Sequence, residues 1–448
     1  MRTLLSGNKI HFTSLGCARN LVDTEVMLGL VLKAGYEVTD HLQEADFLVV
    51  NTCGFLASSR RESCETIDGL FQEKKGEAKV IVVGCMVQKH KEELKTQFPA
   101  IHYFLGSGDM ERILEAIQTP TAGEAVTSAR SYLEWGEVPR KISTPSHYAY
   151  LKIAEGCAKR CAFCIIPKIK GPLRSKSEEQ VVKEFDLLLK QGVKEIILIA
   201  QDLGDYGKER KEERGLEKLL SRLLQSDKDF WLRLLYLYPD EITPELIALM
   251  QSDTRICRYL DMPIQHIDDQ MLKAMRRKTS RTQILTTLEK LRKDVPGICI
   301  RTSLMVGFPG ETEEQFEELV AFVQNYPLDN VGIFTYSREE ESASAQMPHH
   351  VSEEIKQRRF ERLAAVQMQQ VRKRSKRYIG KRLAVLVEGY HPDSPHLMRG
   401  RFYGQCPEID GQVIINDGRL VEAFGTFYDV QITDSADYDL IGKVIKRA

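Results

Sequence analysis

The stretch EGCAKRCAFC, residues 155–164, places Cys157, Cys161 and Cys164 within eight positions. Thiolates this close together on one loop are typical metal ligands, and a metal bound by cysteine usually takes four ligands. A structural zinc site would need a fourth Cys or His, but the sequence has no second C-x2-C pair and no nearby histidine that completes a set. A cubane iron–sulfur cluster fits better, because three thiolates can hold three of its irons and leave the fourth open to a small molecule.

The region that follows this loop alternates strand and helix patterns. Six apolar runs predict strands at 149–156, 195–201, 231–238, 258–264, 298–307 and 330–336. Ser177, Thr243 and Thr312 stand where helix N-caps belong, each followed by acidic residues. The pattern predicts a partial (β/α) barrel of six units, with the cysteine loop at the carboxyl end of its first strand, where such folds place their chemistry.

The C-x3-C-x2-C spacing, its position after a strand and the barrel pattern together resemble the radical S-adenosylmethionine (SAM) superfamily. The resemblance implies that the amino and carboxylate groups of SAM complete the open iron. It also implies that electron transfer from the cluster cleaves SAM to a 5′-deoxyadenosyl radical. The stretch VGFPGET, residues 306–312, ends the fifth strand. Glycine- and proline-rich stretches are usually turns, but within such a barrel Gly307 and Gly310 are expected to contact the adenosine of SAM.

A second set of cysteines lies in the first segment of the chain. Strand patterns are expected at 9–16, 45–52 and 79–84, with helical patterns at 20–35 and 89–98. Cys17, Cys53 and Cys85 each come directly after one of these strands. Because the carboxyl ends of parallel strands share one edge of a sheet, the three thiols are expected to converge there. Buried structural thiols are the alternative, since free cysteine is among the most buried residue types.

The N-terminal sheet with its spread cysteines, the barrel and a C-terminal β module together resemble the radical SAM methylthiotransferases over nearly the whole chain. The resemblance implies two 4Fe-4S clusters: one on the 155–164 loop that binds SAM, and an auxiliary, sulfur-carrying one on the three strand-end cysteines. One SAM would methylate the sulfur on the auxiliary cluster, and another would generate the radical that activates a C–H bond for the methylthio group. The cysteines that match no ligand position of the family are Cys64, Cys257, Cys299 and Cys406.

Composition places the chain in a broad class. Of its 448 residues, 42% are hydrophobic and 28% charged, as is ordinary for a soluble globular protein. The N-terminus has no apolar signal-type region and the sequence has no run of about 18 apolar residues, so a cytoplasmic protein without a membrane segment is expected. In that compartment, ten cysteines favour metal or redox chemistry over disulfides. The formal net charge of −1 gives no overall attraction to nucleic acid.

The chain is expected to divide into four parts: an N-terminal methylthiotransferase domain at 1–118, a linker at 119–147, a radical SAM domain at 148–377 and a TRAM-like β-barrel module at 378–448. The linker is rich in small and turn-forming residues, with a short ordered piece expected around Trp135. A strongly charged helix, at about 352–377, ends the third part, and short strand patterns follow it.

Methylthiotransferases of this family act on a tRNA adenosine or on an aspartate of a small-subunit ribosomal protein. Gln265-His266, after the fourth strand, and PEIDG, residues 407–411, resemble the protein-modifying branch. Departures from that branch's tail motif occur at Phe402, Gly404, Gln405 and Cys406. The resemblance implies as acceptor an aspartate of small-subunit ribosomal protein twelve, within the ribosomal subunit, and requires an electron donor and a sulfur source. His266 fits a purely structural role equally well.

Charge gives an independent argument about the acceptor. Residues 378–448 contain eight basic and ten acidic residues, a net charge of −2, whereas RNA-binding modules present a basic face to phosphate. An acidic tail suits a basic ribosomal protein. The basic stretch QQVRKRSKR before it either touches ribosomal RNA or is a solvated face. The alternatives are a tRNA adenosine methylthiotransferase and, from another class, a non-catalytic metal-binding scaffold on the ribosome. SAM-dependent formation of 5′-deoxyadenosine separates the enzymes from the scaffold.

Overall fold

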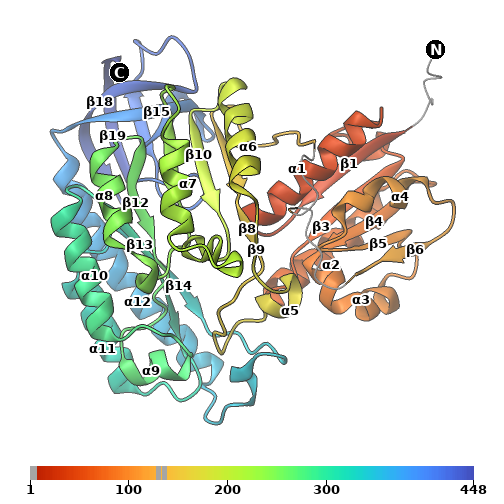
Figure 1. The fold of residues 1–448 in the computed structure, drawn as a ribbon, viewed down its shortest axis with the longest axis horizontal. Coiled ribbons are helices and arrows are strands. Elements are labelled where there is room, and N and C mark those ends of the chain that lie inside the picture. The colour runs from red at the N-terminus through yellow and green to blue at the C-terminus, as the bar shows by residue number, and fades with distance from the viewer. Residues whose placement is uncertain (1–7, 128–132, 134–138) are drawn as a thin grey trace.

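The computed structural model describes residues 8–127, 133 and 139–448, which build two six-stranded parallel sheets and one closed β-barrel (Figure 1). The N-terminal sheet and its helices lie on one side of the molecule, and the central sheet with the C-terminal barrel lies on the other. This is the α/β architecture expected from the alternation of strands and helices. Among the described helices, none combines the length and the apolar character that a membrane crossing requires.

The N-terminal sheet has its strands in the order β2-β1-β3-β4-β5-β6. They are β1 Lys9–Ser14, β2 Glu37–Val38, β3 Phe47–Thr52, β4 Lys79–Gly84, β5 Tyr103–Gly106 and β6 Gly123–Ala125. The strands β1, β3 and β4 are those expected from the sequence, whereas the three others are short and their apolar patterns do not stand out. β6 lies within the expected linker and pairs with β5. The ordered piece expected around Trp135 lies outside the described residues.

Helices cover both faces of this sheet. α1 Ala18–Lys33 and α4 Ile113–Gln118 pack on one face, and α2 Ala57–Glu73 and α3 Cys85–Gln97 pack on the other. Because both faces are buried, the central strands read as continuous apolar runs. The expected helix 20–35 corresponds to α1 and the expected helix 89–98 to α3, whereas α2 is a polar helix whose apolar residues are sparse among charged ones.

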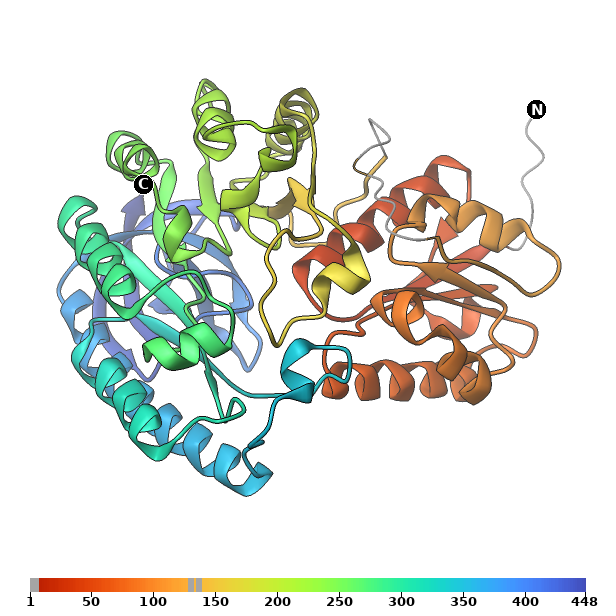
Figure 2. The same ribbon diagram turned by 60° about the horizontal axis from the view of Figure 1, so that its bottom comes forward.

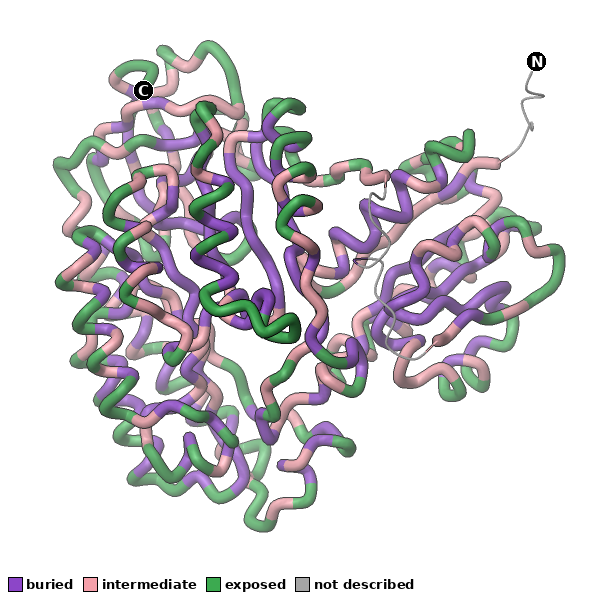
Figure 3. Tube along the Cα trace, in the orientation of Figure 1, coloured by how far each residue is buried: buried purple, intermediate pink, exposed green. Residues whose placement is uncertain are grey.

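The central sheet has its six parallel strands in sequence order, which confirms the partial barrel. Its strands are β7 Tyr148–Lys152, β10 Glu195–Ile199, β11 Trp231–Leu234, β12 Ile256–Asp261, β13 Cys299–Val306 and β14 Asn330–Thr335. The helices around its outer face (Figure 2) are α6 Glu178–Lys190, α7 Gly215–Leu223, α8 Pro244–Ser252, α10 Arg281–Asp294 and α11 Glu313–Asn325. Ser177, Thr243 and Thr312 cap α6, α8 and α11 as expected. Figure 3 shows the strands buried and the outer helix faces exposed.

The chain then runs through α12 Glu353–Ser375 into the C-terminal barrel. The barrel closes in the order β15-β16-β17-β19-β18. Its strands are β15 Arg382–His391, β16 Ser394–Phe402, β17 Val413–Asp417, β18 Thr426–Ala436 and β19 Asp439–Arg447. This confirms the small β-barrel module, of which β16 and β19 were not recognised in the sequence.

The C-terminal barrel packs into the inner face of the central sheet at the amino ends of its strands. Tyr150, Trp231 and other inward-facing residues share one apolar cluster with the core of the tail, and the ring of Trp231 lies 4.6 Å from that of Phe427. The PEIDG stretch reaches into the same space. Glu408 accepts a hydrogen bond from the Tyr148 hydroxyl at 2.9 Å, and Asp410 accepts one from Tyr259 at 2.7 Å.

A buried charge cluster completes this contact. Glu195, at the start of β10, accepts a hydrogen bond from Arg233 Nε at 2.6 Å and pairs with Arg401 of the tail at 2.6 Å. Arg401 also pairs with Glu388 at 2.6 Å. All four side chains are buried or nearly so, with Arg233 and Glu195 fully enclosed. The tail therefore packs against the inner face of the partial barrel through both apolar contacts and buried ion pairs.

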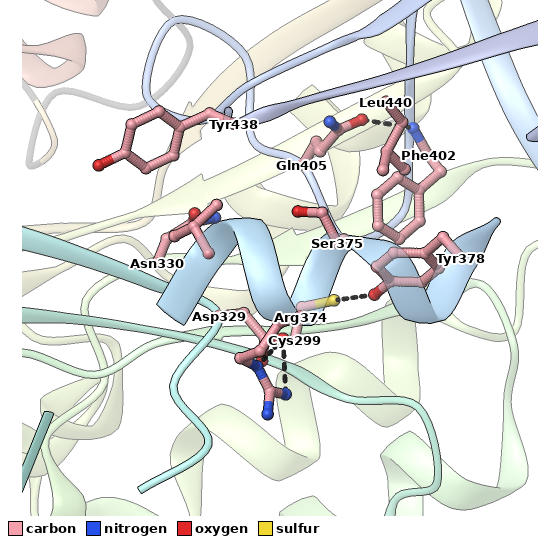
Figure 4. Close-up of a pocket in the computed structure, with 12 residues that line it drawn as sticks. Cys299, Asp329, Asn330, Arg374, Ser375, Tyr378, Phe402, Gln405, Tyr438 and Leu440 are labelled. Atoms are coloured by element: carbon pink, nitrogen blue, oxygen red, sulfur yellow. Dashed lines mark hydrogen bonds and ion pairs between the residues drawn. The ribbon is translucent and has the colours of Figure 1, made fainter. Parts of the chain in front are cut away.

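The end of α12 is the second contact between the central sheet and the tail (Figure 4). The Cys299 Sγ lies 3.3 Å from the Tyr378 hydroxyl, and Arg374 pairs with Asp329 at 3.0 Å. The cavity beside them holds about 40 Å³, room for little more than a water molecule. Arg377 also pairs with Asp329, at 2.6 Å. Much of the basic stretch QQVRKRSKR, residues 369–377, therefore stabilises the contact between the central sheet and the tail.

Candidate active site at the junction of two cysteine sites

The three N-terminal cysteines meet at the carboxyl edge of their sheet. Cys17 is the N-cap residue of α1, Cys53 directly follows β3, and Cys85 opens α3 directly after β4. The strands β1, β3 and β4 are parallel neighbours, so their ends lie side by side. Gly16, with a φ of +88°, passes so close that an added Cβ would lie 3.3 Å from Cys53 Sγ. Asn20 Oδ1 lies 3.7 Å from Cys85 Sγ.

The electrostatic environment of these thiols is uneven. Burial opposes ionisation of Cys17, but the Arg19 guanidinium and the backbone N–H groups of Asn20 and Arg19 outweigh it and hold its pKa below the usual value. Burial, together with the nearby Cys17 and Cys53, raises the pKa of Cys85 to about 12 despite the opposing charge of Lys170. The three sulfur atoms are thus close enough to interact. A metal that binds them displaces their protons, because the thiolate is the ligand.

The second trio lies on the loop after β7. Each sulfur faces one N–H donor: Cys157 Sγ faces the Lys159 amide at 3.4 Å, Cys164 Sγ faces the Ile166 amide at 3.4 Å, and Cys161 Sγ faces Arg277 at 3.5 Å. Burial raises the pKa of Cys157 to about 11 and that of Cys164 to about 12. Hydrogen bonds to ligand sulfurs are a recurrent feature of iron–sulfur sites. The donor set therefore fits a cubane cluster.

Lys159 ties this loop to the barrel. Its Nζ lies 3.2 Å from Asp202, 3.3 Å from Asp205 and 2.6 Å from Glu241, all in the loops after β10 and β11. The carboxylate oxygens lie close enough together to hold a metal ion, but here they surround the lysine ammonium. Burial raises the pKa of Asp202 to about 7, and the charge of Lys159 opposes that increase. The carboxylates therefore serve as an anchor for the cysteine loop.

The two trios face each other across the junction of the two sheets. Cys85 packs in one apolar cluster with Ile165 and Ile169, which follow Cys164 in the chain. Ile169 belongs to α5 Ile166–Lys170. Arg19 lies near both trios, since its charge favours the thiolate of Cys17 and that of Cys164. Sequence reasoning placed each trio at a sheet edge but did not predict that the two edges meet.

Buried ion pairs fix this junction. Asp23 on α1 pairs with Lys152 at the end of β7 and lies 3.3 Å from Lys170 Nζ, while Glu155 lies 2.9 Å from the same nitrogen. All four side chains are at most 5% exposed. Removing one member of such a buried set lowers the stability of the fold, because it leaves a buried charge without a partner. The N-terminal sheet is therefore held in one position relative to the barrel.

The segment between the sheets adds to this attachment. Arg140 pairs with Glu25 of α1 at 2.5 Å and with Glu184 of α6 at 2.7 Å. Ser143 donates to the same Glu25 carboxylate through its amide at 2.6 Å. The expected linker thus ends in a fixed bridge between the two halves.

Gly307 and Gly310 lie after β13, on either side of Phe308. Phe308 shares an apolar cluster with Ala162 of the cysteine loop and with Met271 and Met275. The stretch is therefore beside the loop. An added Cβ on Gly307 would collide with the Lys356 side chain, whereas an added Cβ on Gly310 would have no neighbour within 4 Å.

His266 is fully buried and both its ring nitrogens have partners. The Asp268 amide donates to Nδ1 at 3.0 Å, and Nε2 lies 3.3 Å from Glu311 Oε1. Because Nδ1 accepts a hydrogen bond, Nε2 carries the ring hydrogen and donates a hydrogen bond to Glu311. These contacts give the histidine a structural role in the loop after β12. Gln265, its neighbour, has a φ of +73°, which is rare for a residue with a side chain.

The remaining cysteines lie apart from both trios. Cys64 is in α2, where its Sγ lies 3.5 Å from Gln97 Oε1. Cys257, Cys299 and Cys406 are buried in the contact between the central sheet and the tail. Their position agrees with the expectation that they are not ligands.

Comparison with known protein families matches three parts of the chain: uncharacterized protein family UPF0004 at residues 9–106, the radical SAM superfamily at 151–323 and the TRAM domain at 379–445. A protein of Protochlamydia amoebophila, named ribosomal protein uS12 methylthiotransferase RimO, is 63% identical, with 98% of this chain and 93% of that protein covered. A Chlamydia felis protein of the same name is 56% identical, with coverage of 99% and 96%. The chain belongs to the RimO family.

As a member of the RimO family, the chain is a radical SAM methylthiotransferase, and the superfamily implies a 4Fe-4S cluster and SAM. Among solved structures, the radical SAM methyltransferase TsrM of Kitasatospora setae matches with a TM-score of 0.54 at 16% identity, with 87% of this chain and 82% of that chain covered. That likeness reflects the shared fold alone.

Proposed function

We propose that this enzyme attaches a methylthio group to the β-carbon of an aspartate in ribosomal protein uS12, within the small ribosomal subunit. The high identity to proteins of that name over the full length supports this assignment. The observation that carries it is that the two cysteine trios meet at one junction, where Cys85 packs against Ile165 and Ile169, just after Cys164 in the chain. An enzyme that unites sulfur delivery with radical chemistry needs both sites beside one acceptor.

We assign the two trios separate tasks. Cys157, Cys161 and Cys164 are proposed to hold the 4Fe-4S cluster that binds SAM. Cys17, Cys53 and Cys85 are proposed to hold an auxiliary 4Fe-4S cluster that carries the sulfur. When bound, these groups supply a 5′-deoxyadenosyl radical at the first site and a methylated sulfur at the second. The N-terminal domain 1–118, the radical SAM domain 148–377 and the TRAM-like tail 378–448 would each keep the role that their family resemblance implies.

The chain's own residues orient the ligands and shield the site. The Lys159 and Ile166 amides and Arg277 would each donate to one sulfur of the loop. Lys159 holds the loop against the carboxylates of the barrel through its ammonium. Gly307 and Gly310 are proposed to let the backbone approach the adenosine of SAM, which the packing of Phe308 against Ala162 supports. The docked tail closes the amino end of the barrel and keeps water from entering there.

The tail contributes less surface charge than its composition suggests. Of its acids, Glu388, Glu408 and Asp410 point into the contact with the barrel, and Asp437 pairs with Arg372. Attraction of a basic partner would therefore rest on the remaining outer acids. Contact with ribosomal RNA would fall to Lys373 and Lys376, the exposed cations of α12 and its end that form no ion pair among the described residues. We further propose a cytoplasmic location and an external electron donor and sulfur source.

Two cysteine variants test the division of tasks. Anaerobically reconstituted wild type should bind about eight irons if both sites hold a cubane cluster. Cys161→Ala should abolish 5′-deoxyadenosine formation, whereas Cys53→Ala should retain that cleavage and lose methylthio transfer. Methylthio transfer at the wild-type rate by Cys53→Ala would show that the N-terminal trio is only structural.

The acceptor is tested by competition. The enzyme is offered uS12-containing ribosomal subunits and unmodified tRNA together, and both are analysed by mass spectrometry. One methylthio group on the uS12 aspartate is the expected result. Its appearance on tRNA alone would replace this assignment with the nucleic-acid branch, and the absence of both together with the absence of 5′-deoxyadenosine would favour a scaffold.

A further inference from the structure

Arg19 occupies an unusual position at the junction of the two sheets. It lies in the first turn of α1, two residues after Cys17. Its Nη1 donates a hydrogen bond to the carbonyl oxygen of Ala200 at 2.8 Å, just after β10. Its guanidinium lies over the ring of Tyr236, 5.1 Å from the centroid. The side chain therefore reaches out of the N-terminal sheet and ends above the carboxyl edge of the barrel.

Tyr236 is held in a conformation that presents its ring to Arg19. It has a φ of +64°, which is uncommon for any residue with a side chain and costs free energy for a bulky one. The Leu203 amide donates to the Tyr236 carbonyl oxygen at 2.9 Å and so helps to fix this backbone. The stacked ring restricts the guanidinium to one plane and leaves its edge available to a further partner.

The lysines around Arg19 have carboxylate partners, but Arg19 forms no ion pair with a carboxylate among the described residues. Lys152 and Lys170 pair with Asp23, and Lys159 pairs with Glu241. Arg277 also has no carboxylate partner among the described residues, and its guanidinium lies 3.5 Å from Cys161 Sγ. A guanidinium has five N–H donors; one of those of Arg19 binds Ala200, and the guanidinium also lies within hydrogen-bonding reach of the Cys17 thiol.

The residue after Ala200 carries a polar atom without a partner among the described residues. Gln201 follows Ala200 at the end of β10, and its Oε1 is buried without a hydrogen-bond partner in the part of the chain that the structure describes. Buried polar groups are rarely left unpaired, and a site that binds a ligand is one of the reasons for exceptions. The end of β10 thus lies against an arginine without a carboxylate partner and carries an amide oxygen without a hydrogen-bond partner, both among the described residues. A peptide segment that carries a carboxylate offers the complementary groups.

We propose that Arg19 binds the side-chain carboxylate of the acceptor aspartate and thereby places its β-carbon between the two cysteine sites. This inference rests on the proposed function. The β-carbon is bonded directly to the carboxylate carbon, so a bidentate hold on the carboxylate fixes the reacting carbon one bond away. Gln201 Oε1 accepts an N–H of the bound segment in this arrangement. Arg19 would be a binding and positioning residue, since it links the Cys17 end of α1 to the end of β10 and takes no part in bond changes.

The test measures binding of uS12 to the reconstituted enzyme, with uS12 carrying either aspartate or asparagine at the acceptor position. Wild-type enzyme should bind the aspartate form at least about 10-fold more tightly than the asparagine form, because a hydrogen bond between charged groups is worth about 1.5–3 kcal/mol. Arg19→Gln should bind the aspartate form more weakly and lose the preference for it. Arg19→Lys keeps the charge but loses the planar fork, so a reduced preference should survive. Lys33→Gln, at the exposed far end of the same helix, is the matched control and should behave as wild type.

Iron content of each variant is measured in parallel, because Arg19 lies beside Cys17. If Arg19→Gln binds its irons and still prefers aspartate to the wild-type degree, Arg19 only balances the charge of the cysteine site and the inference is wrong. If wild-type enzyme itself shows no preference for aspartate, the inference is likewise wrong. Failure of the proposed function is a distinct result, since wild-type enzyme would then leave uS12 without a methylthio group.

Discussion

Replacing Glu195 with glutamine should release the C-terminal barrel from the interior of the central sheet. Glu195 is fully buried between the guanidinium groups of Arg233 and Arg401, each at 2.6 Å. Burial opposes its ionisation, but the two arginines outweigh that effect and hold its pKa below the usual value. The glutamine keeps the shape and part of the hydrogen bonding while it removes the negative charge. The two buried arginines remain charged, because guanidinium does not lose its proton in proteins.

The size of the effect follows from the geometry. Only the pair with Arg401 joins the central sheet to the tail; at an effective dielectric constant of about 20, unit charges about 4 Å apart attract by roughly 4 kcal/mol, which is the upper limit of the loss. Relaxation and remaining hydrogen bonds reduce the loss, and broken buried pairs cost about 3–5 kcal/mol. At 1.4 kcal/mol per tenfold, undocking of the tail should become roughly 10²- to 10³-fold more frequent.

Hydrogen exchange read by mass spectrometry measures this opening. Glu195→Gln should lose amide protection in β10 and β15, while the N-terminal sheet keeps its protection. Glu318→Gln is the matched control, because Glu318 pairs with Arg281 at 2.7 Å on the surface, where ion pairs contribute little. Wild-type protection of β10 and β15 in the Glu195 variant would refute the view that this charge cluster holds the tail in place.

Three further outcomes are expected. Lys159→Met should remove the anchor of the cysteine loop and lower bound iron from about eight to about four, which an iron assay measures; full occupancy would show that the loop holds without it. Gly16→Ala should also lower iron, at the other site, because its Cβ would lie 2.9 Å from Cys53 Cβ at a φ of +88°; unchanged iron would show that the backbone shifts freely. Burial opposes ionisation of Glu184, but Lys176 and Arg140 outweigh it and hold its pKa at about 2. Its contribution to stability is therefore present above about pH 4.5 and lost as pH falls toward 2, so Glu184→Gln should show a flatter loss of thermal stability with acid than wild type.

The sequence is informative where function depends on local spacing. The 155–164 loop, the strands before Cys17, Cys53 and Cys85, and the caps Ser177 and Thr312 are all recognisable within a few residues of chain. Each follows from the period of a strand or the chemistry of a helix end, which neighbouring residues determine.

Contacts between distant parts of the chain are not recognisable in this way. Arg19 and Ala200 are 181 positions apart, and Tyr148 and Glu408 are 260 apart. No pattern within either segment shows that they meet, so the sequence suggests surface charge for the tail's acids, whereas Glu408 accepts a hydrogen bond from Tyr148 of the barrel. A charged residue two positions from Cys17 was nevertheless a visible signal that could have marked Arg19 as a site residue.

The buried charges between α1 and the barrel restrict how the two halves of this enzyme can be recombined. Asp23 on one side and Lys152, Glu155 and Lys170 on the other form a single charge-balanced set. A chimera that joined the N-terminal part of one relative to the remainder of another would be viable only if the set were inherited whole. A mismatch at one position would leave an orphan charge inside the hybrid. Crossovers that preserve these four positions should therefore be the ones that yield folded hybrid enzymes.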